Sequence, residues 1–266
     1  ALWRGSVKLG ERVEVIARNV EGCAAHPGTD SCGYCGMGCR RGNKRGTLAT
    51  YIQRAADKGA RIIVGAEVKT VLTAQGQAQG VKAVVSAGGG KQVNVTVKAK
   101  RVVLAVGSIH TPAILMRSGI GDAAALTALG IAVLHDAPAV GRHFMDHPIL
   151  RASLALKPGF RAEGADARHT NCCLTYSSKL GGGGERDMII IAYNHRGLVE
   201  SGVAPNGGIG VALYDALSRG EVRLTSADPD AQPLVEENML DHPADRLRMR
   251  DGVRRLAQLC ALAPIA

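Results

Sequence analysis

The chain has 266 residues, 46% of them hydrophobic, so it can bury a core that fits one large or two moderate domains. Its formal net charge is +10, but only Tyr34 and Tyr51 lie within the arginine-rich stretch, so the basic residues are interpreted as a solvated face rather than as a patch for nucleic acid or an anionic membrane. No apolar run approaches the ~20 residues that a membrane-spanning helix needs.

The first hundred residues predict a loop, a helix and several strands. Residues 23–46 are rich in glycine and cysteine, which is typical of a loop. Residues 47–58 carry apolar side chains at helical spacing, and Gly59 supplies the stop. Short apolar segments then predict strands at residues 60–64, 68–72, 81–85 and 93–97, the last two paired across the glycines at 88–90.

A strand, a turn and a helix are predicted between residues 100 and 121. The uninterrupted apolar run at residues 102–106 is typical of a buried strand in a parallel sheet. Gly107 allows close approach of the backbone at the carboxyl end of this strand, where open α/β sheets bind their ligands. We expect Thr111 and Pro112 to open the following helix, and Gly119 to end it.

From residue 148 onward the pattern changes. Segments at residues 149–156, 188–193, 208–214 and 221–225 predict an antiparallel sheet. Residues 245–262 predict an amphipathic helix with five apolar residues near one stripe: Leu247, Met249, Val253, Leu256 and Leu259. The predicted fold class is therefore α/β of mixed α+β character, in two domains at residues 1–145 and 146–266.

Three blocks of sequence resemble the glucose-methanol-choline (GMC) oxidoreductases. Residues 107–121 read Gly-Ser-Ile-His-Thr-Pro-Ala-Ile-Leu-Met-Arg-Ser-Gly-Ile-Gly, which resembles the second signature of that family. Residues 140–148 resemble its Val-Gly-x-Asn-Leu-x-Asp-His segment, and residues 218–229 resemble its Ser-Arg-Gly-x-Val-x-Leu strand and turn. The resemblance implies a partial FAD-binding, Rossmann-like domain at residues 1–145 and a partial substrate-binding domain with an antiparallel sheet at residues 146–266.

The sequence departs from the family pattern in several places. His143 stands where the family usually has Asn. The Gly-x-Gly-x-x-Gly turn that places the FAD pyrophosphate on a helix N-terminus does not occur. The catalytic His segment of the family lies beyond its equivalent of Pro264. The chain is therefore expected to be an interior fragment that is inactive alone, and no residue is assigned a catalytic role.

The resemblance implies four cofactor-binding residues. Val68 corresponds to a position whose backbone meets the adenine of FAD. Gly107 and Ser108 begin the second signature. The alternative role of Ser108, a hydrolase nucleophile, would need a Gly-x-Ser-x-Gly elbow, and none surrounds this residue. His147 is expected to be a structural contact near the flavin rather than a catalytic base.

Four cysteines on the loop at residues 23–46 are candidate metal ligands: Cys23, Cys32, Cys35 and Cys39. The block resembles the Cys-rich segment of long-chain alcohol oxidases, and a related branch of sugar dehydrogenases carries an iron–sulfur cluster in the corresponding loop. Clustered thiolates suit soft metals, but the spacing does not match paired zinc ligands. A loop without metal is the favoured alternative, and the remaining cysteines on strands and helices are expected to pack rather than react.

The implied function is oxidation of a primary or secondary alcohol by hydride transfer to FAD, with oxygen, a quinone or a cytochrome as electron acceptor. The pattern does not separate a fatty alcohol from a sterol, choline or a sugar. The rival hypothesis is a non-catalytic metal- or partner-binding module derived from a flavoprotein. Seven cysteines and the lack of an export signal in this sequence favour a cytoplasmic or peripheral-membrane location.

Overall fold

The computed structural model describes residues 2–21, 39, 42–157, 170, 172–193 and 207–262. The chain forms two compact units, each assembled from separate segments. Unit 1 comprises Ala1–Ala60, His147–Leu217 and Leu240–Ala266, and unit 2 comprises Arg61–Asp146 and Ser218–Met239. The chain therefore passes between units at four places, one of which follows Asp146. The predicted division into domains at residues 1–145 and 146–266 stays a prediction.

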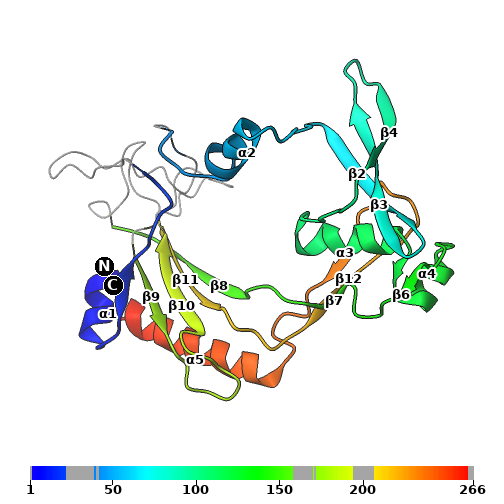
Figure 1. The fold of residues 1–266 in the computed structure, drawn as a ribbon. Helices are drawn as coiled ribbons and strands as arrows, with labels where there is room; N and C mark the ends of the chain where they lie inside the picture. Colours follow the sequence, from blue (N-terminus) through cyan, green and yellow to red (C-terminus); the bar gives the residue numbers. More distant parts are fainter. Residues whose placement is uncertain are drawn as a thin grey trace. The chain divides into compact units, whose positions relative to one another are not determined.

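Unit 1 is built on a five-stranded antiparallel sheet in the order β1-β9-β10-β11-β8 (Figure 1). Its strands are β1 (Val13–Val15), β8 (Ile149–Leu154), β9 (Cys172–Tyr176), β10 (Met188–Tyr193) and β11 (Gly207–Leu213). The predicted antiparallel pairing of the C-terminal half is confirmed by β8, β10 and β11. β9 and β1 extend the sheet beyond β10, on the side away from β11.

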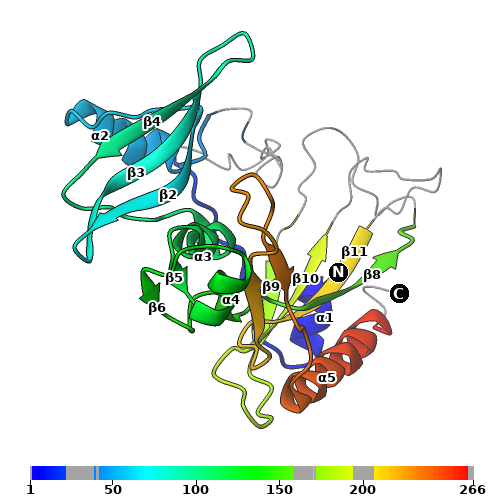
Figure 2. The ribbon, with the colours of Figure 1, turned by 90° about the vertical axis from the view of Figure 1, so that its right-hand side faces the viewer.

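Helix α5 (Pro243–Cys260) covers one face of this sheet (Figure 2). His242 caps its N-terminus by accepting a hydrogen bond from the Ala244 N–H, and Pro243 occupies the first turn, where no backbone donor is needed. Met249, Leu256 and Leu259 pack against the buried side chains of β9, β10 and β11. Two residues of the predicted stripe, Leu247 and Val253, are instead exposed.

The described residues of unit 1 also form three short helical segments: α1 (Leu2–Lys8), a π-helical turn η2 (Leu48–Ile52) and α2 (Gln53–Asp57). The helix predicted at residues 47–58 is therefore present, although its first turn has the wider π geometry. Gly59 follows it with a φ of +87°, a conformation that glycine adopts without a steric penalty.

Unit 2 contains a three-stranded antiparallel meander of β2 (Ala66–Ala74), β3 (Gln77–Ser86) and β4 (Gln92–Lys98). Gln75 and Gly76 connect β2 to β3 with positive φ angles at both positions, as a tight two-residue hairpin turn requires. The pairing of β3 with β4 confirms the predicted hairpin across the three glycines.

Helix α3 (Gly107–Arg117) packs against β2 in the same unit. Further elements are β5 (Ile120–Gly121), α4 (Ala123–Ala128), β6 (His135–Asp136), and a small sheet of β7 (Arg142–Phe144), β12 (Gly220–Arg223) and β13 (Leu234–Glu236). Helix α3 begins at Gly107, so the expectation that Thr111 and Pro112 open it is wrong by one turn. Its end before Gly119 is confirmed, with Gly119 at a φ of +83°.

The mixed α/β fold class is confirmed, but two predicted strands are wrong. Residues 60–64 and 100–106 form no strand. Val64 is 84% exposed and Val103 is 87% exposed, so these apolar runs are not buried either. A strand needs a neighbour that accepts and donates its backbone hydrogen bonds, and no segment of the described residues pairs with these two runs.

Candidate functional site

The start of α3 is an open helix N-terminus. Gly107 has a φ of +86°, and a side chain at this position would meet no atom within 4 Å. Val106 occupies the N-cap position, and no side chain caps the helix. The first N–H groups of a helix lack internal acceptors and lie at the positive end of the helix dipole. Gly107 and Ser108 therefore present backbone donors to an acceptor oxygen or an anion.

Strand β2 carries Val68 at an edge of the meander. The pairing of β2 with β3 shifts between Val68 and Thr70, which is the mark of a β-bulge. Val71 donates its backbone N–H to the Ser118 hydroxyl oxygen at 2.8 Å, and that hydroxyl donates to the Ile114 carbonyl at 2.6 Å. Since Ser118 directly follows α3, these hydrogen bonds hold the C-terminal end of the helix against β2. Val68 and the two signature residues thus lie on adjacent elements of one unit.

A cation at the bulge was not anticipated from the sequence. The Lys69 ammonium lies 2.7 Å from a Glu67 carboxylate oxygen and 2.5 Å from an Asp230 oxygen. Arg117 donates from Nη2 to the Ala231 carbonyl at 2.5 Å. The turn around residues 228–231 is therefore tied to both β2 and α3. Burial lowers the pKa of Lys69, but hydrogen bonds and attraction to the two carboxylates outweigh it, and the pKa is raised.

His147 belongs to the other compact unit, at the entry to β8. Its ring lies 4.7 Å from the ring of Tyr214 between centroids, in a tilted arrangement. The next residue, Pro148, is buried and accepts a hydrogen bond from the Leu213 N–H. Three of the four predicted cofactor-binding residues, Val68, Gly107 and Ser108, therefore lie in unit 2, and His147 lies in unit 1. The contact of His147 with the flavin stays a prediction.

Comparison with models of known protein families identifies the family of this chain. Two family models, both described as GMC oxidoreductase, match residues 1–149 and residues 216–265. The chain belongs to the GMC oxidoreductases. The first match covers more than half of the sequence and includes Val68, Gly107, Ser108 and His147. The predicted resemblance is therefore confirmed, whereas the likeness to long-chain alcohol oxidases stays a prediction.

Individual GMC relatives share part of their length with this chain. A 5-(hydroxymethyl)furfural oxidase from Methylovorus sp. (strain MP688) is 33% identical over 64% of this chain and 32% of its own length. An oxygen-dependent choline dehydrogenase from Acinetobacter baumannii (strain AYE) is 27% identical over 80% of this chain and 43% of its own length. The crystal structure of pyridoxine 4-oxidase from Mesorbium loti shares the fold, with a TM-score of 0.70 at 20% identity, over 85% of this chain and 44% of that one. The chain thus spans less than half the length of these relatives.

The geometry of unit 2 fits the adenosine part of FAD, the cofactor that the GMC family implies. An edge strand offers backbone donors and acceptors to the edge of a base, and β2 is an edge strand of the meander, on which the Val71 N–H points away from β3 and is already bonded to Ser118. The uncapped start of α3 offers N–H groups to an oxygen of the ribose or a phosphate. Val68, Gly107 and Ser108 would hold this part of the cofactor.

The loop cysteines lie largely outside the part of the chain that the structure describes. Cys39 is described and accepts a hydrogen bond from the Asn43 N–H at 3.2 Å, whereas Cys23, Cys32 and Cys35 lie outside the described residues. Within the described ranges, no group of three or more His, Cys, Asp or Glu side chains is arranged to hold a metal ion. The iron–sulfur cluster stays a prediction. Among the described helices, none is long and apolar enough to cross a membrane.

The other described cysteines sit on regular elements. Cys172 and Cys173 lie on β9, and Cys260 ends α5. Burial raises the pKa of all three thiols, and Glu14 raises that of Cys173 further. Because the thiolate is the reactive form, this environment favours packing over reaction.

Proposed function

We propose that this chain is part of an FAD-dependent oxidoreductase that oxidises the CH–OH group of a primary or secondary alcohol. Membership in the GMC family supports the oxidoreductase class, and the relatives named for 5-(hydroxymethyl)furfural and choline, which both carry a CH2–OH group, support an alcohol substrate. FAD, when bound, supplies the acceptor for the hydride that leaves the alcohol carbon. Oxygen, a quinone or a cytochrome would take the electrons, and the name of the choline relative favours oxygen.

The observation that carries the proposal is the open start of α3 beside β2. Gly107 and Ser108 position donors for the cofactor, while the Ser118 bond to Val71 fixes the helix against the strand. The role of these residues is to bind and orient the adenosine part of FAD. The sequence has no Gly-x-Gly-x-x-Gly turn for the FAD pyrophosphate, so we expect weak FAD binding, and no side chain is assigned to the proton transfer, so we expect no turnover by the chain alone.

The test is equilibrium dialysis of the purified chain with ADP, FAD and riboflavin. ADP and FAD should bind with similar, weak affinity, because both carry the adenosine part, and riboflavin should not bind. Equal binding of riboflavin and ADP would contradict the proposed adenosine site. Stoichiometric flavin retained through purification would contradict the expected weak binding.

A matched pair of glycines controls for backbone strain. Gly107 and Gly130 both belong to unit 2, have positive φ angles, and would place a side chain in open space. Gly107→Leu should reduce ADP binding because the new side chain covers the start of α3. Gly130→Leu carries a similar conformational penalty and should bind ADP like the original chain.

The Cys-rich loop supports a second candidate, a metal- or partner-binding module derived from a flavoprotein. Four cysteines between residues 23 and 39 are the observation that favours it. Iron or zinc that copurifies with the chain, while ADP and FAD fail to bind, would favour this module over the flavoenzyme. A cytoplasmic or peripheral-membrane location remains part of the proposal, to be tested by fractionation of the source cells.

A further inference from the structure

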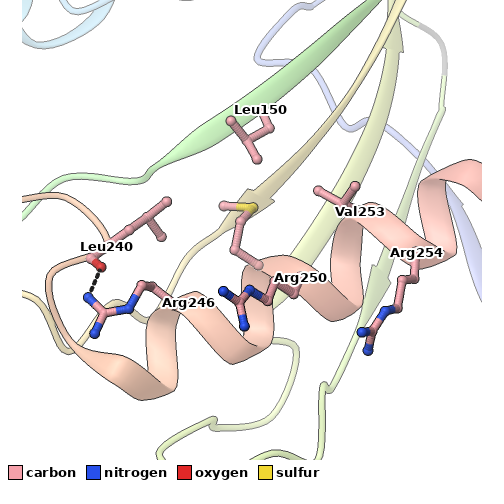
Figure 3. Close-up of a pocket in the computed structure, with 7 residues that line it drawn as sticks. Leu150, Leu240, Arg246, Arg250, Val253 and Arg254 are labelled. Carbon is pink, nitrogen blue, oxygen red and sulfur yellow. Dashed lines mark hydrogen bonds between the residues drawn. The ribbon is translucent and has the colours of Figure 1, made fainter.

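A groove lies between α5 and the edge strand β8 of unit 1 (Figure 3). Its volume is about 380 Å³, within the range of roughly 300–1,000 Å³ that is typical of small-molecule sites. Seven residues line it: Leu150, Leu240, Arg246, Met249, Arg250, Val253 and Arg254. The four apolar residues and the three arginines form two distinct parts of the groove.

The apolar part exists because α5 does not cover the whole sheet. The helix packs on the strands at the centre, where Val211 of β11 is completely buried. Leu150 of β8 is paired in register with Val211 but lies one strand further out, and it is 45% exposed. Met249 of α5 is buried beneath the groove, and Val253, one turn later, is 40% exposed. Leu150 and Val253 therefore leave apolar surface open to a ligand.

Leu240 lies near the start of α5 in a conformation that is uncommon for its type. Its φ is +60°, in the left-handed region that costs an L-residue with a side chain about 1–2 kcal/mol. Arg246 donates from Nη1 to the Leu240 carbonyl at 2.8 Å and also to the Asp241 carbonyl. These bonds hold the Leu240 backbone in place. Strained residues of this kind concentrate at ligand-binding sites.

The polar part carries positive charge. Arg246, Arg250 and Arg254 follow one another at intervals of one helical turn (Figure 3). Arg246 is engaged with the two carbonyls, but Arg250 and Arg254 are exposed and form no ion pair with any described residue. The other two arginines at the middle and end of α5 are paired with carboxylates: Arg248 with Asp187 and Asp245, and Arg255 with Glu11 and Asp251.

The Cα atoms of Arg250 and Arg254 are about 6 Å apart along the helix axis, so the two exposed and flexible side chains can both reach a single carboxylate. The apolar strip begins beside them at Val253. We propose that this groove binds a single-chain anionic amphiphile, with its carboxylate at Arg250 and Arg254 and its alkyl chain along Val253, Met249 and Leu150. The two guanidinium groups favour a ligand with a carboxylate, and the apolar strip favours a ligand with a long alkyl chain.

The test is calorimetric titration of the full chain with hexanoate, octanoate, decanoate and decanol below their micellar concentrations. Decanoate should bind at one site, and roughly 15-fold more tightly than octanoate, because each buried methylene contributes about fourfold. Decanol should bind about tenfold more weakly than decanoate, because it lacks the charge that the two arginines recognise.

Two double variants separate the two parts of the groove, and a single variant elsewhere on the chain is the control. Arg250→Gln with Arg254→Gln should remove the preference for decanoate over decanol. Leu150→Ser with Val253→Ser should make the binding affinity depend less on the length of the alkyl chain. All four substituted residues are exposed, so the fold should tolerate these changes. Arg101→Gln, an exposed arginine of unit 2, removes one charge outside the groove and should bind like the original chain.

Several results would overturn the proposal. Equal binding of hexanoate and decanoate would mean a site for anions alone. Unchanged decanoate binding in both double variants would place the ligand elsewhere on the chain. No binding of decanoate, together with binding to vesicles that contain phosphatidylserine or to an acidic protein, would assign the arginines to a surface for a larger partner.

Discussion

Arg248 is completely buried on α5, and its guanidinium bridges two carboxylates that are also completely buried. It donates to Asp187 at 3.3 Å, to Asp245 at 2.5 Å and to the Asp215 carbonyl at 2.8 Å. Asp187 also accepts bonds from Ser178, and Asp245 from the Leu217 N–H. The network therefore links the helix to the turns at the end of the sheet.

Replacing Arg248 by Met should destabilise unit 1 by about 3–5 kcal/mol, because two buried carboxylates lose their counter-charge. Urea unfolding followed by circular dichroism measures this change. Arg254→Met on the exposed side of the same helix should change stability by less than about 0.5 kcal/mol. A similar small effect at both positions would mean that Arg248 is accessible to water in solution.

Lys69 supports a prediction about pH. Burial lowers its pKa in the folded chain, but Asp230 and Glu67 together raise it by more, so its contribution to stability is complete below the unfolded pKa of about 10.5. That contribution is lost as the pH rises through the higher folded pKa. Because both carboxylates are largely exposed, we expect Lys69→Met to cost only about 0.5–1 kcal/mol at pH 8.

At pH 11.5 the difference between Lys69→Met and the original chain should become smaller. Comparing unfolding free energies at the two pH values checks this, since groups other than Lys69 contribute equally to both proteins. Lys82→Met, an exposed position on the neighbouring strand β3, serves as the control without carboxylate partners among the described residues. A difference that grows with pH would contradict the ion pairs of Lys69.

At the scale of elements, Gly252 allows α5 to lie close to the sheet. A side chain at this position would place its Cβ 2.7 Å from Val211 Cγ2 and 2.8 Å from Met188 Cε. The methionine end can move, but the valine is branched and held in the central part of the sheet. The close approach of the helix depends on the glycine rather than on helix propensity.

Gly252→Ala should therefore destabilise unit 1 by about 1–3 kcal/mol from overpacking, even though alanine favours the helix by about 1 kcal/mol. Thermal and urea unfolding measure the net effect. Adding Val211→Ala removes the obstructing methyl groups, so the double variant should lose less than the sum of the two single changes. Stabilisation by Gly252→Ala alone would show that the helix stands further from β11 than the structure places it.

Elements whose partners are close in sequence could be predicted, and those with distant partners could not. The hairpin of β3 and β4 and the helix α5 follow from local patterns and turn residues. The pairing of Val13 with Leu174 joins segments about 160 residues apart, and nothing in the short β1 pattern indicates it. The positive φ of +60° at His143 accounts for the family's Asn at this position, because Asn adopts that conformation readily.

The candidate site was predicted only in part for the same reason. The family resemblance indicated Gly107 and Ser108 because they begin a recognisable sequence block, and it indicated Val68 only as the counterpart of a family position outside the three blocks. The ion pair between Lys69 and Asp230 joins segments that are distant in sequence. The groove beside α5 depends on which part of the sheet the helix leaves uncovered. Neither leaves a pattern along the chain.

At the scale of the whole molecule, residues 61–64 and 101–106 are apolar segments without strand partners in the described structure. Their backbone N–H groups donate no hydrogen bond to any described residue. Amides that lack such bonds and are open to water exchange with solvent without unfolding of the domain. The adjacent strands β2 and β4, in contrast, are hydrogen-bonded within the meander.

Hydrogen–deuterium exchange with mass spectrometry should therefore find rapid exchange at residues 61–64 and 101–106 and slow exchange within β2–β4 of the same chain. Val103→Thr should leave unfolding free energy within about 0.5 kcal/mol, whereas Val211→Thr in the buried sheet should cost more than 1 kcal/mol because its hydroxyl lacks a partner there. Protection of both segments in the isolated chain, together with a large cost of Val103→Thr, would mean that they pair with each other or with a second copy. Protection that develops only when other parts of a GMC protein are added would identify them as strands that complete a larger sheet.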